Sequence, residues 1–313
     1  MIWEMTTNKD TTYHIPVMLQ ECLDGLAINP NGVYVDVTFG GGGHSRAIFE
    51  KLNKGQLIAF DQDPDARKNA WDDERFYFIA GNFAYLENHL KMMGVGKVDG
   101  ILADLGVSSH QFDQPERGFS IRSDQPLDMR MNPTDELSAK EVVNTYSLED
   151  LRSILQKYGE LKNAGRVANT IVKMRSSSPI ITTGQLVGLI KHLTPRKKEN
   201  QFLAQVFQAI RIEVNREMEV LEKFLAQTAD VLKDDGRLVV MSYHSLEDRL
   251  VKNYMKRGSF DGEIEKDFYG NVLKPFVEVT RKPITASDKE LEFNPRSRSA
   301  KLRVAYRNSL DEG

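Results

Sequence analysis

The amino-acid sequence predicts an α/β fold with a mostly parallel, doubly wound sheet. Two observations support this prediction: short apolar runs alternate with helical patterns over the first third of the chain, and polar or glycine-rich segments stand where these runs end. In such sheets a ligand binds at the carboxyl ends of the strands. The expected strand ends carry residues 40–44, Asp61, residues 82–83 and Asp104, so we expect them to converge on one binding site.

The first strand and the turn behind it organise the chain. The alternating apolar residues of 33–37 predict a buried strand, which is followed by consecutive glycines at 40–43. A glycine turn between a strand and a helix lets the backbone approach a nucleotide-like ligand closely. Neither glycine frame completes the G-x-G-x-x-G/A spacing of dinucleotide sites, because Ser45 and Arg46 stand at the closing positions. With Asp36 on the strand, this looser turn suits S-adenosylmethionine as the cofactor.

The next elements repeat the alternation of strands and helices. Residues 55–61 predict a second strand whose last residue, Asp61, stands 17 residues after His44, close to the spacing of a ribose-hydroxyl ligand. The following patterns predict helices over 65–71 and 85–93. They predict the third and fourth strands over 76–79 and 97–105. The fourth strand therefore places Asp104 at its carboxyl end.

The alternation stops after Asp104. Residues 104–136 contain three prolines and no convincing period, and their aromatic and arginine side chains favour a functional lid over a linker. Helical patterns then extend over 147–158, 164–172 and 186–193. We therefore expect two parts of one α/β domain, an all-helical substrate-recognition insertion between them, and flexible tails at the two ends. The α/β domain is expected over 12–111 and 211–307, and the insertion over 112–210. The tails are expected over 1–11 and 308–313.

The sheet resumes after the helical insertion. Residues 236–243 predict a fifth strand that ends at His244. The Ser245-x-x-Asp248 spacing is that of a helix start, while the strand-end position also predicts that His244 and Ser245 face the ligand cleft. Two last strands are expected over 276–283 and 300–307, which gives a sheet of seven strands.

Positive charge is concentrated in the helical insertion. The whole chain has a net charge of −3, whereas residues 151–198 hold ten lysines and arginines against one acid, Glu160. A solvated helical face is the usual explanation of a charged run, but so large a local excess favours binding to a polyanion. We expect RNA contacts here and in the basic segment 294–307. The candidates are Arg166, Lys173, Arg175, Arg196, Lys197, Lys198, Arg296 and Arg298.

The remaining composition limits the chemistry. Cys22 is the only cysteine, which excludes an internal disulfide and a multi-cysteine metal site, and six scattered histidines do not suggest a metal, so we expect none. Cys22 lies on a helical run away from the expected strand ends, where a small buried hydrophobe is a better interpretation than a nucleophile. The sequence has neither an apolar run of about 18 residues nor a signal-peptide pattern, so a cytoplasmic location without a membrane partner is expected.

Ten sequence blocks follow one another between about residue 13 and residue 307. They are HIPVML, DVTFGGGGHS, FDQDP, GNF, DLGVSSHQFD, RGFS, PLDMRM, FQAIRI, SYHSLEDR and NPRSRSAKLR. In these blocks the chain resembles the bacterial small-subunit ribosomal RNA cytosine-N4 methyltransferase family, and DLGVSS and HSLEDR are specific to that family. One place differs, because Gln205 and Val206 stand where relatives carry an arginine and a threonine.

The resemblance implies a class I, Rossmann-like methyltransferase fold and methylation of a decoding-region cytosine on its exocyclic N4. It also implies S-adenosylmethionine as the cofactor and small-subunit ribosomal RNA, or the small ribosomal subunit, as the partner. Carried over by motif, the cofactor-binding residues would be Gly42, Gly43 and His44 at the methionine end, Asp61 at the ribose, Phe83 near the adenine, and Asp104 and Gln111.

The chemistry of amino methylation suggests further roles. The exocyclic nitrogen of cytosine is a poor nucleophile because its lone pair is delocalised into the ring, and an acceptor for its N–H bonds would localise that pair. Asp104 is the natural acceptor. Ser108 and Ser109 are candidates to fix the base edge, and His244 is a further catalytic candidate. The base must leave its stack to be reached, and its stacking partner is expected among Phe112, Phe119 and Tyr243.

Two other functions remain open from the sequence. The first is methylation of another amino group, such as adenine N6, although DLGVSS lacks the two prolines and the aromatic residue typical of amino-methylating DNA enzymes. The second is a non-catalytic RNA-binding assembly factor, which the intact glycine turn and Asp61 disfavour.

Overall fold

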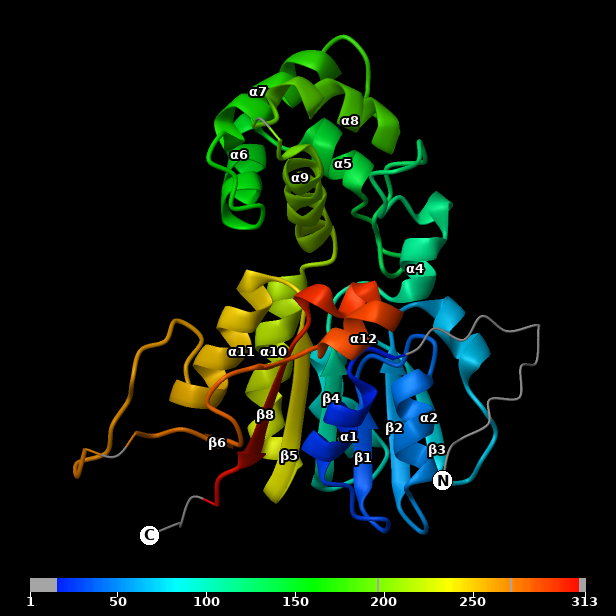
Figure 1. The fold of residues 1–313 in the computed structure, drawn as a ribbon, viewed down its shortest axis with the longest axis vertical. Helices are drawn as coiled ribbons and strands as arrows, with labels where there is room; N and C mark the ends of the chain where they lie inside the picture. Colours follow the sequence, from blue (N-terminus) through cyan, green and yellow to red (C-terminus); the bar gives the residue numbers. More distant parts are fainter. Residues whose placement is uncertain (1–15, 196, 271, 310–313) are drawn as a thin grey trace.

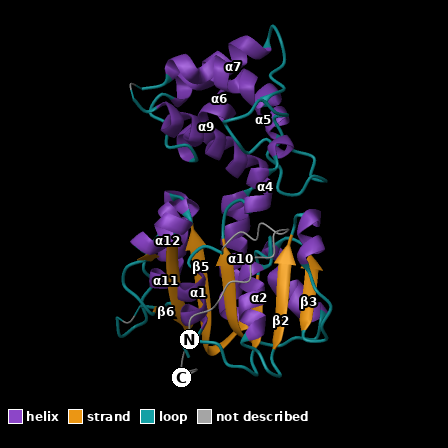
Figure 2. Cartoon of the chain, turned by 45° about the vertical axis from the view of Figure 1, so that its right-hand side comes forward, coloured by secondary structure: helices purple, strands orange, loops and turns teal. Residues whose placement is uncertain are grey.

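The computed structural model describes residues 16–195, 197–270 and 272–309, which form two bodies (Figure 1). One is an α/β body built around a central sheet. The other is an all-helical body, and Figure 2 shows that the parallel strands of the sheet point toward it with their carboxyl ends.

The sheet has the mostly parallel arrangement that the sequence predicted. Its strands are β1 (Val33–Asp36), β2 (Gln56–Asp61), β3 (Phe76–Ala80), β4 (Val98–Asp104), β5 (Leu232–Ser242), β6 (Phe276–Glu278), β7 (Ile284–Thr285) and β8 (Lys301–Arg307). They follow the order β3-β2-β1-β4-β5-β8-β6, and β7 pairs with β8. The first five strands are parallel to one another, whereas β8 runs antiparallel to β5 and β6. The sheet has eight strands instead of seven, because the strand expected over 276–283 ends at Glu278 and the short β7 follows it.

Helices cover both faces of the sheet because its strands are apolar on both sides. In β2, Leu57 and Ala59 belong to one buried apolar cluster, while Ile58 and Phe60 belong to the other, as alternation along a strand requires. The first face is covered by α1 (Leu19–Leu26) and α2 (Gly43–Glu50). The second is covered by α3 (Leu86–Met92), α10 (Glu217–Val231) and α11 (Ser245–Arg257). A sixth helix, α12 (Asp288–Phe293), precedes β8, and the helix expected over 65–71 is a 3₁₀ helix, Pro64–Asn69.

The helical body has its own apolar core, with residues from Phe119 to Val214. Val206, which stands where the chain departs from its relatives, is completely buried in this core, so its role there is packing. The expected boundary at 210 falls inside the last helix, which leads into α10 through Asn215 and Arg216. None of the helices in the described ranges is both long and apolar enough to span a membrane. The helices of this body are α5 (Ala139–Thr145), α6 (Leu148–Lys157), α7 (Ala164–Arg175), α8 (Thr183–Ile190) and α9 (Glu199–Val214).

The segment after β4 connects the two bodies. It begins at the sheet with the short helix α4 (Ser109–Asp113) and a 3₁₀ turn, Pro115–Arg117. Farther along, the N–H of Gln125 donates to Thr183 Oγ1 on α8 at 3.0 Å, and Met129 is buried in the helical core. A segment fixed at both ends is an ordered bridge and not a flexible linker.

Candidate active site

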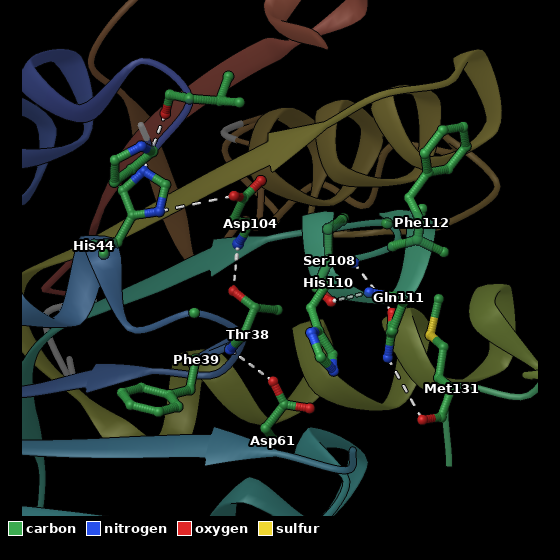
Figure 3. A pocket seen from close by; sticks show the side chains of 18 of the residues that line it. Thr38, Phe39, His44, Asp61, Asp104, Ser108, His110, Gln111, Phe112 and Met131 are labelled. Carbon is green, nitrogen blue, oxygen red and sulfur yellow. Dashed lines mark hydrogen bonds and ion pairs between the residues drawn. The ribbon is translucent and has the colours of Figure 1, made fainter. Parts of the chain in front are cut away.

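A cavity of about 750 Å³ lies at the carboxyl ends of β1, β2 and β4, where the connecting segment meets the sheet (Figure 3). Residues from the glycine turn, from the ends of β2 and β4, and from α4 line it. The structure therefore brings together Gly43, His44, Asp61, Phe83 and Asp104, which the sequence assigned to one site.

The glycine turn adopts backbone angles that other residues rarely take. Gly40 and Gly42 have φ angles of 50° and 76°, and Gly42 is the residue just before α2. A Cβ atom on Gly41 would meet nothing within 4 Å, so the backbone is open there. Gly40, Gly41 and Gly43 line the cavity. Gly42, expected as a cofactor contact, is not among the lining residues, and its left-handed angle shapes the turn between two lining glycines.

Asp61 and Phe83 form the cavity wall on the β2 side. Asp61 Oδ2 accepts the N–H of Gly40 at 2.7 Å, and its Oδ1 accepts the N–H of Asp63 at 2.8 Å. Desolvation raises the pKa of Asp61 to about 6, although both backbone bonds act in the opposite direction. Each carboxylate oxygen keeps a second lone pair, so Asp61 can still accept hydrogen bonds from ligand hydroxyls. Phe83 packs edge-on against Phe224, with ring centres 5.3 Å apart.

Asp104, the last residue of β4, is held from three sides. Its Oδ1 accepts the hydroxyl hydrogen of Tyr243 at 2.7 Å, its N–H donates to Thr38 Oγ1 at 2.7 Å, and its Oδ2 lies 3.7 Å from His44 Nδ1. Desolvation raises the pKa of Asp104 to about 6, while His44 and Tyr243 act to lower it. A carboxylate that is oriented in this way and still ionised at neutral pH is suited to accept a proton.

A buried network behind the glycine turn positions His44. The Nε2 atom of His44 lies 3.0 Å from the carbonyl oxygen of Val17, so this nitrogen carries a proton and Nδ1 faces Asp104. Asp36 is 1% exposed and accepts the hydroxyl of Ser45 at 2.6 Å. It also accepts a backbone N–H at 3.0 Å. The strand carboxylate that the sequence associated with the cofactor is therefore part of the scaffold beneath the turn.

Ser108 and Gln111 line the cavity and are bonded to each other. The Ser108 hydroxyl oxygen accepts the N–H of Gln111 at 3.1 Å, and Gln111 Oε1 accepts the N–H of Ser108 at 3.1 Å, which forms a reciprocal cap on α4. Gln111 Nε2 donates to Asp63 Oδ2 at 2.8 Å. The cap fixes this wall, and the Ser108 hydroxyl still has a hydrogen to donate. Ser109 is the first residue of α4.

An ion pair that sequence reasoning missed ties the connecting segment to the end of β2. Arg117 Nη1 lies 2.9 Å from Asp63 Oδ2, and the two side chains are 10% and 4% exposed. Arg117 Nη2 also donates to the carbonyl oxygens of Arg130 and Met131, at 3.0 and 2.9 Å. Asp63 belongs to the block FDQDP and Arg117 to the block RGFS. The resemblance singled out both blocks, but the sequence did not indicate that the two residues pair.

The three aromatic residues considered for base stacking lie in different environments. Phe119 is buried in the core of the helical body and is not among the residues that line the cavity. Tyr243 lines the cavity, with its hydroxyl engaged as described. Phe112 also lines it and is 40% exposed, with the Arg296 guanidinium 5.5 Å from its ring centre. Arg296 in turn pairs with Asp113, so it belongs to the rim of the cavity.

The structure corrects the expectation for His244. This residue is not among those that line the cavity, and it caps α11 instead, where its Nδ1 accepts the N–H of Glu247 at 3.4 Å. Ser245, also expected to face the cleft, is exposed and donates its hydroxyl hydrogen to Glu160 Oε2 at 3.0 Å. At this strand end, Tyr243 is the residue that reaches the cavity.

The basic candidates divide into exposed and structural residues. Arg175 is structural, because its guanidinium donates to the carbonyl oxygens of Val143 and Tyr146 at the end of α5. The expected RNA contact through Arg175 is therefore withdrawn. Arg196 lies outside the described residues. The exposed candidates are Arg166 and Lys173 on α7, Lys197 and Lys198 before α9, and Arg296 and Arg298 before β8.

A family model and two relatives match nearly the whole chain. A family model described as the MraW methylase family matches residues 11–308. The ribosomal RNA small subunit methyltransferase H of Parabacteroides distasonis is 55% identical over 299 residues, which cover 95% of this chain and 98% of that protein. The protein of the same name from Christiangramia forsetii is 56% identical over 294 residues, which cover 94% and 97%. A solved rRNA methylase from Streptococcus thermophilus is 11% identical, with a TM-score of 0.43 and coverage of 95% and 99%.

Proposed function

The chain belongs to the MraW methylase family, and we propose that the cavity at the carboxyl ends of β1, β2 and β4 is its active site. The enzyme transfers a methyl group from S-adenosylmethionine to the exocyclic N4 of a cytosine in small-subunit ribosomal RNA. The blocks DLGVSS and HSLEDR support a decoding-region cytosine as the target.

The residues at the cavity fit S-adenosylmethionine. The open turn at Gly41 gives access to the backbone, Asp61 has acceptor capacity for ribose hydroxyls, and Phe83 offers an apolar wall for the adenine. A cavity of about 750 Å³ is also of the size typical of cofactor sites. When bound, S-adenosylmethionine supplies an electrophilic methyl group on a sulfonium sulfur. The residues of this chain bind and orient the reactants and accept the proton.

The position of Asp104 carries the mechanism that we propose. Its Oδ1 atom is bound by Tyr243, whereas its Oδ2 lies 3.7 Å from His44, beyond hydrogen-bond distance, and is available to the cytosine amino group. Accepting one N–H of that group returns lone-pair density to the nitrogen. As the nitrogen bonds to the methyl carbon, one of its two protons passes to Asp104, which later releases it to solvent.

The exposed basic residues of the helical body support RNA binding. Arg166, Lys173 and Lys198 belong to the body that lies beyond the carboxyl ends of the strands, on the cavity side of the sheet (Figure 2). Phosphate contacts of this kind position RNA without reading its sequence. We place the unstacked target base beside Phe112 and Arg296, where the cavity has an exposed aromatic ring at its rim.

Transfer of a labelled methyl group tests this function. The protein and labelled S-adenosylmethionine are offered free small-subunit RNA, small ribosomal subunits and DNA, and the modified nucleoside is then identified. We expect N4-methylcytidine from a substrate that contains the RNA, formed far more slowly by the Asp104→Asn variant. N6-methyladenine would replace the proposal by methylation of another amino group. Cofactor and RNA binding without transfer to any substrate would replace it by a non-catalytic role.

A further inference from the structure

A partly buried polar cluster lies outside the cavity, where the two bodies join. Arg211 comes from the last turns of α9, Glu217 begins α10, and His244 and Glu247 stand at the start of α11. Oxygens of the two glutamates and a ring nitrogen of His244 all lie within 4.8 Å of one another. Two of the sequence blocks therefore meet in space, FQAIRI with Arg211 and SYHSLEDR with His244 and Glu247. Of these blocks, the mechanism above uses only Tyr243.

Glu247 holds the backbone at the end of β5. Its Oε2 atom accepts the N–H of Tyr243 at 2.9 Å and the N–H of His244 at 3.3 Å. In return, His244 Nδ1 accepts the N–H of Glu247 at 3.4 Å, which completes the cap of α11. The side chain of Glu247 is only 4% exposed, so water cannot readily replace these partners.

Two basic side chains keep this buried carboxylate charged. Burial alone would raise the pKa of Glu247, but His244 and Arg211 hold it below its usual range. Arg211 in turn bonds both oxygens of Glu217, through Nε at 2.8 Å and Nη2 at 2.9 Å. The charge environment of Glu247 is therefore fixed from the last helix of the helical body.

The same side chains are close enough to share a metal ion, but His244 is oriented against it. Because its Nδ1 accepts a backbone N–H, the proton of a neutral ring resides on Nε2. That nitrogen, 3.1 Å from Glu247 Oε1, would have to lose its proton to bind an ion. Glu217 already has both oxygens on Arg211. Within the described residues His244 Nε2 makes no hydrogen bond, but an ion placed there would have to displace the bonds between Glu217 and Arg211.

Tyr243 connects this cluster to the active site. Its backbone N–H is held by Glu247, and its hydroxyl donates to Asp104 Oδ1 at 2.7 Å. We propose that Glu247 is a positioning residue for methyl transfer, which fixes Tyr243 so that its hydroxyl keeps Asp104 oriented toward the cytosine amino group. This inference rests on the proposed role of Asp104 as the proton acceptor.

The turn between α9 and α10 also holds a second part of the site. Asn215, in this turn, accepts the N–H of Met131 at 2.7 Å and donates to the carbonyl oxygen of Met129 at 2.8 Å. Met131 lines the cavity. The place where the chain leaves the helical body is thus bonded to the cavity wall directly, and the charge of Arg211 acts on Glu247, which is bonded to Tyr243.

The pH dependence of kcat, measured at saturating cofactor and RNA, tests this role. Tyr243→Phe removes a hydrogen bond to the ionised form of Asp104 and so raises its pKa. The acid limb of the profile, where kcat falls as the pH is lowered, should therefore move to higher pH by about one unit. The other groups that face Asp104 are His44, which lowers the pKa of Asp104, Asp36 and Glu247, which raise it, and the thiol of Cys22. Loss of Glu247 therefore has two opposed effects, one through charge and one through Tyr243.

Two substitutions at one position separate these effects. Glu247→Gln removes the charge but keeps an oxygen that can accept the N–H of Tyr243, whereas Glu247→Ala removes both. We expect the acid limb of E247A to lie about one pH unit above that of E247Q. We also expect the kcat of E247A to be roughly tenfold lower than that of E247Q. On a Tyr243→Phe background the two variants should no longer differ. Asp248→Asn, on the next residue, is the matched control: it weakens the pairs with Arg303 and Lys301 and should lower stability without moving the limb.

Each outcome separates this inference from the function on which it rests. Coincident limbs for E247A and E247Q would overturn the positioning role, even where Tyr243→Phe shifts the limb as expected. A Tyr243→Phe profile equal to that of the parent would instead remove Asp104 from the mechanism. If E247A fails to fold, Glu247→Asp takes its place. It keeps the charge and draws the carboxylate back by one methylene, so an unshifted limb in E247D would count against positioning and an upward shift would support it.

Discussion

In the proposed function, the cavity and the exposed basic residues of the helical body act on one substrate by different physical means. In the cavity, Asp61 and Asp104 are partly buried and are held by hydrogen bonds at fixed positions. On the helical body, Arg166, Lys173 and Lys198 are exposed side chains. A fixed group acts through its own geometry, whereas exposed charges act through their sum. Single substitutions should therefore have large effects in the cavity and small, additive ones on the helical body.

Asp104→Asn should give the largest effect and would define the cavity side of this contrast. Because asparagine cannot accept the proton, kcat should fall by about 10²–10⁴-fold. In the parent, the ionised form of Asp104 is the active one and its pKa is raised to about 6, so kcat should be full at higher pH and fall as the pH drops through about 6. RNA affinity should not change. A variant with the kcat and acid limb of the parent would show that Asp104 is not the acceptor.

Asp61→Ala should give the second largest effect, on cofactor binding. Loss of hydrogen bonds to a charged group should weaken S-adenosylmethionine binding by roughly 1.5–3 kcal/mol, measured by calorimetry. Because the pKa of Asp61 is also raised to about 6, the affinity of the parent should decline below that pH. Asp73→Ala, which removes an ion pair with Arg75, is the matched control and should leave the affinity unchanged. Unchanged affinity in a folded Asp61→Ala protein would remove Asp61 from the site.

The same contrast explains what the sequence could predict. Parallel strands end at one edge of a sheet, so the periodic pattern alone brought Asp61 and Asp104 to one place. The pattern does not say which way a residue at a strand end turns. His244 was expected in the cleft and instead caps α11, because the chain bends after Tyr243. Nor does the pattern give the backbone angles of the turn, where Gly42 adopts a left-handed conformation.

Contacts between residues far apart in the chain could not be predicted from the sequence, for a different reason. Arg117 and Asp63, or Glu247 and Arg211, meet only because the topology brings separate segments together. A count of charges fails in the same way, since it treats Arg175 and Lys173 alike. The first is bonded to carbonyl oxygens at the end of α5, and the second is exposed.

A comparison of variants within α7 tests the small, additive effects expected for the exposed charges of the helical body. Replacing Arg166 and Lys173 together by alanine should reduce RNA affinity and lower the magnitude of the log–log salt slope by up to about 1.5, with cofactor affinity unchanged. Arg175→Ala is the matched variant on the same helix. It should lower the free energy of unfolding by about 1–3 kcal/mol, measured by denaturant titration, without altering the slope. Equal slopes in the parent and the double variant would make this an ordinary solvated face.

Cys22 should give the smallest effect, although its position differs from the one expected. It is completely buried in α1. Burial raises the pKa of its thiol well above the usual value, and the charge of Asp104 adds to this, so the residue is not remote from the end of β4. A neutral thiol is a poor nucleophile, and Cys22 is not among the residues that line the cavity.

Cys22→Ser tests whether nitrogen is the atom that is methylated. Methylation of cytosine at carbon 5 requires a thiolate to add to the ring first, whereas N4 attacks the methyl group itself. The variant should keep its kcat while losing roughly 1–3 kcal/mol of stability, because a hydroxyl replaces a thiol in an apolar core. RNA with 5-fluorocytosine at the target should be methylated without a covalent adduct on a denaturing gel. A trapped adduct, or a folded but inactive variant, would place the chemistry on Cys22 and remove the need for Asp104 as an acceptor.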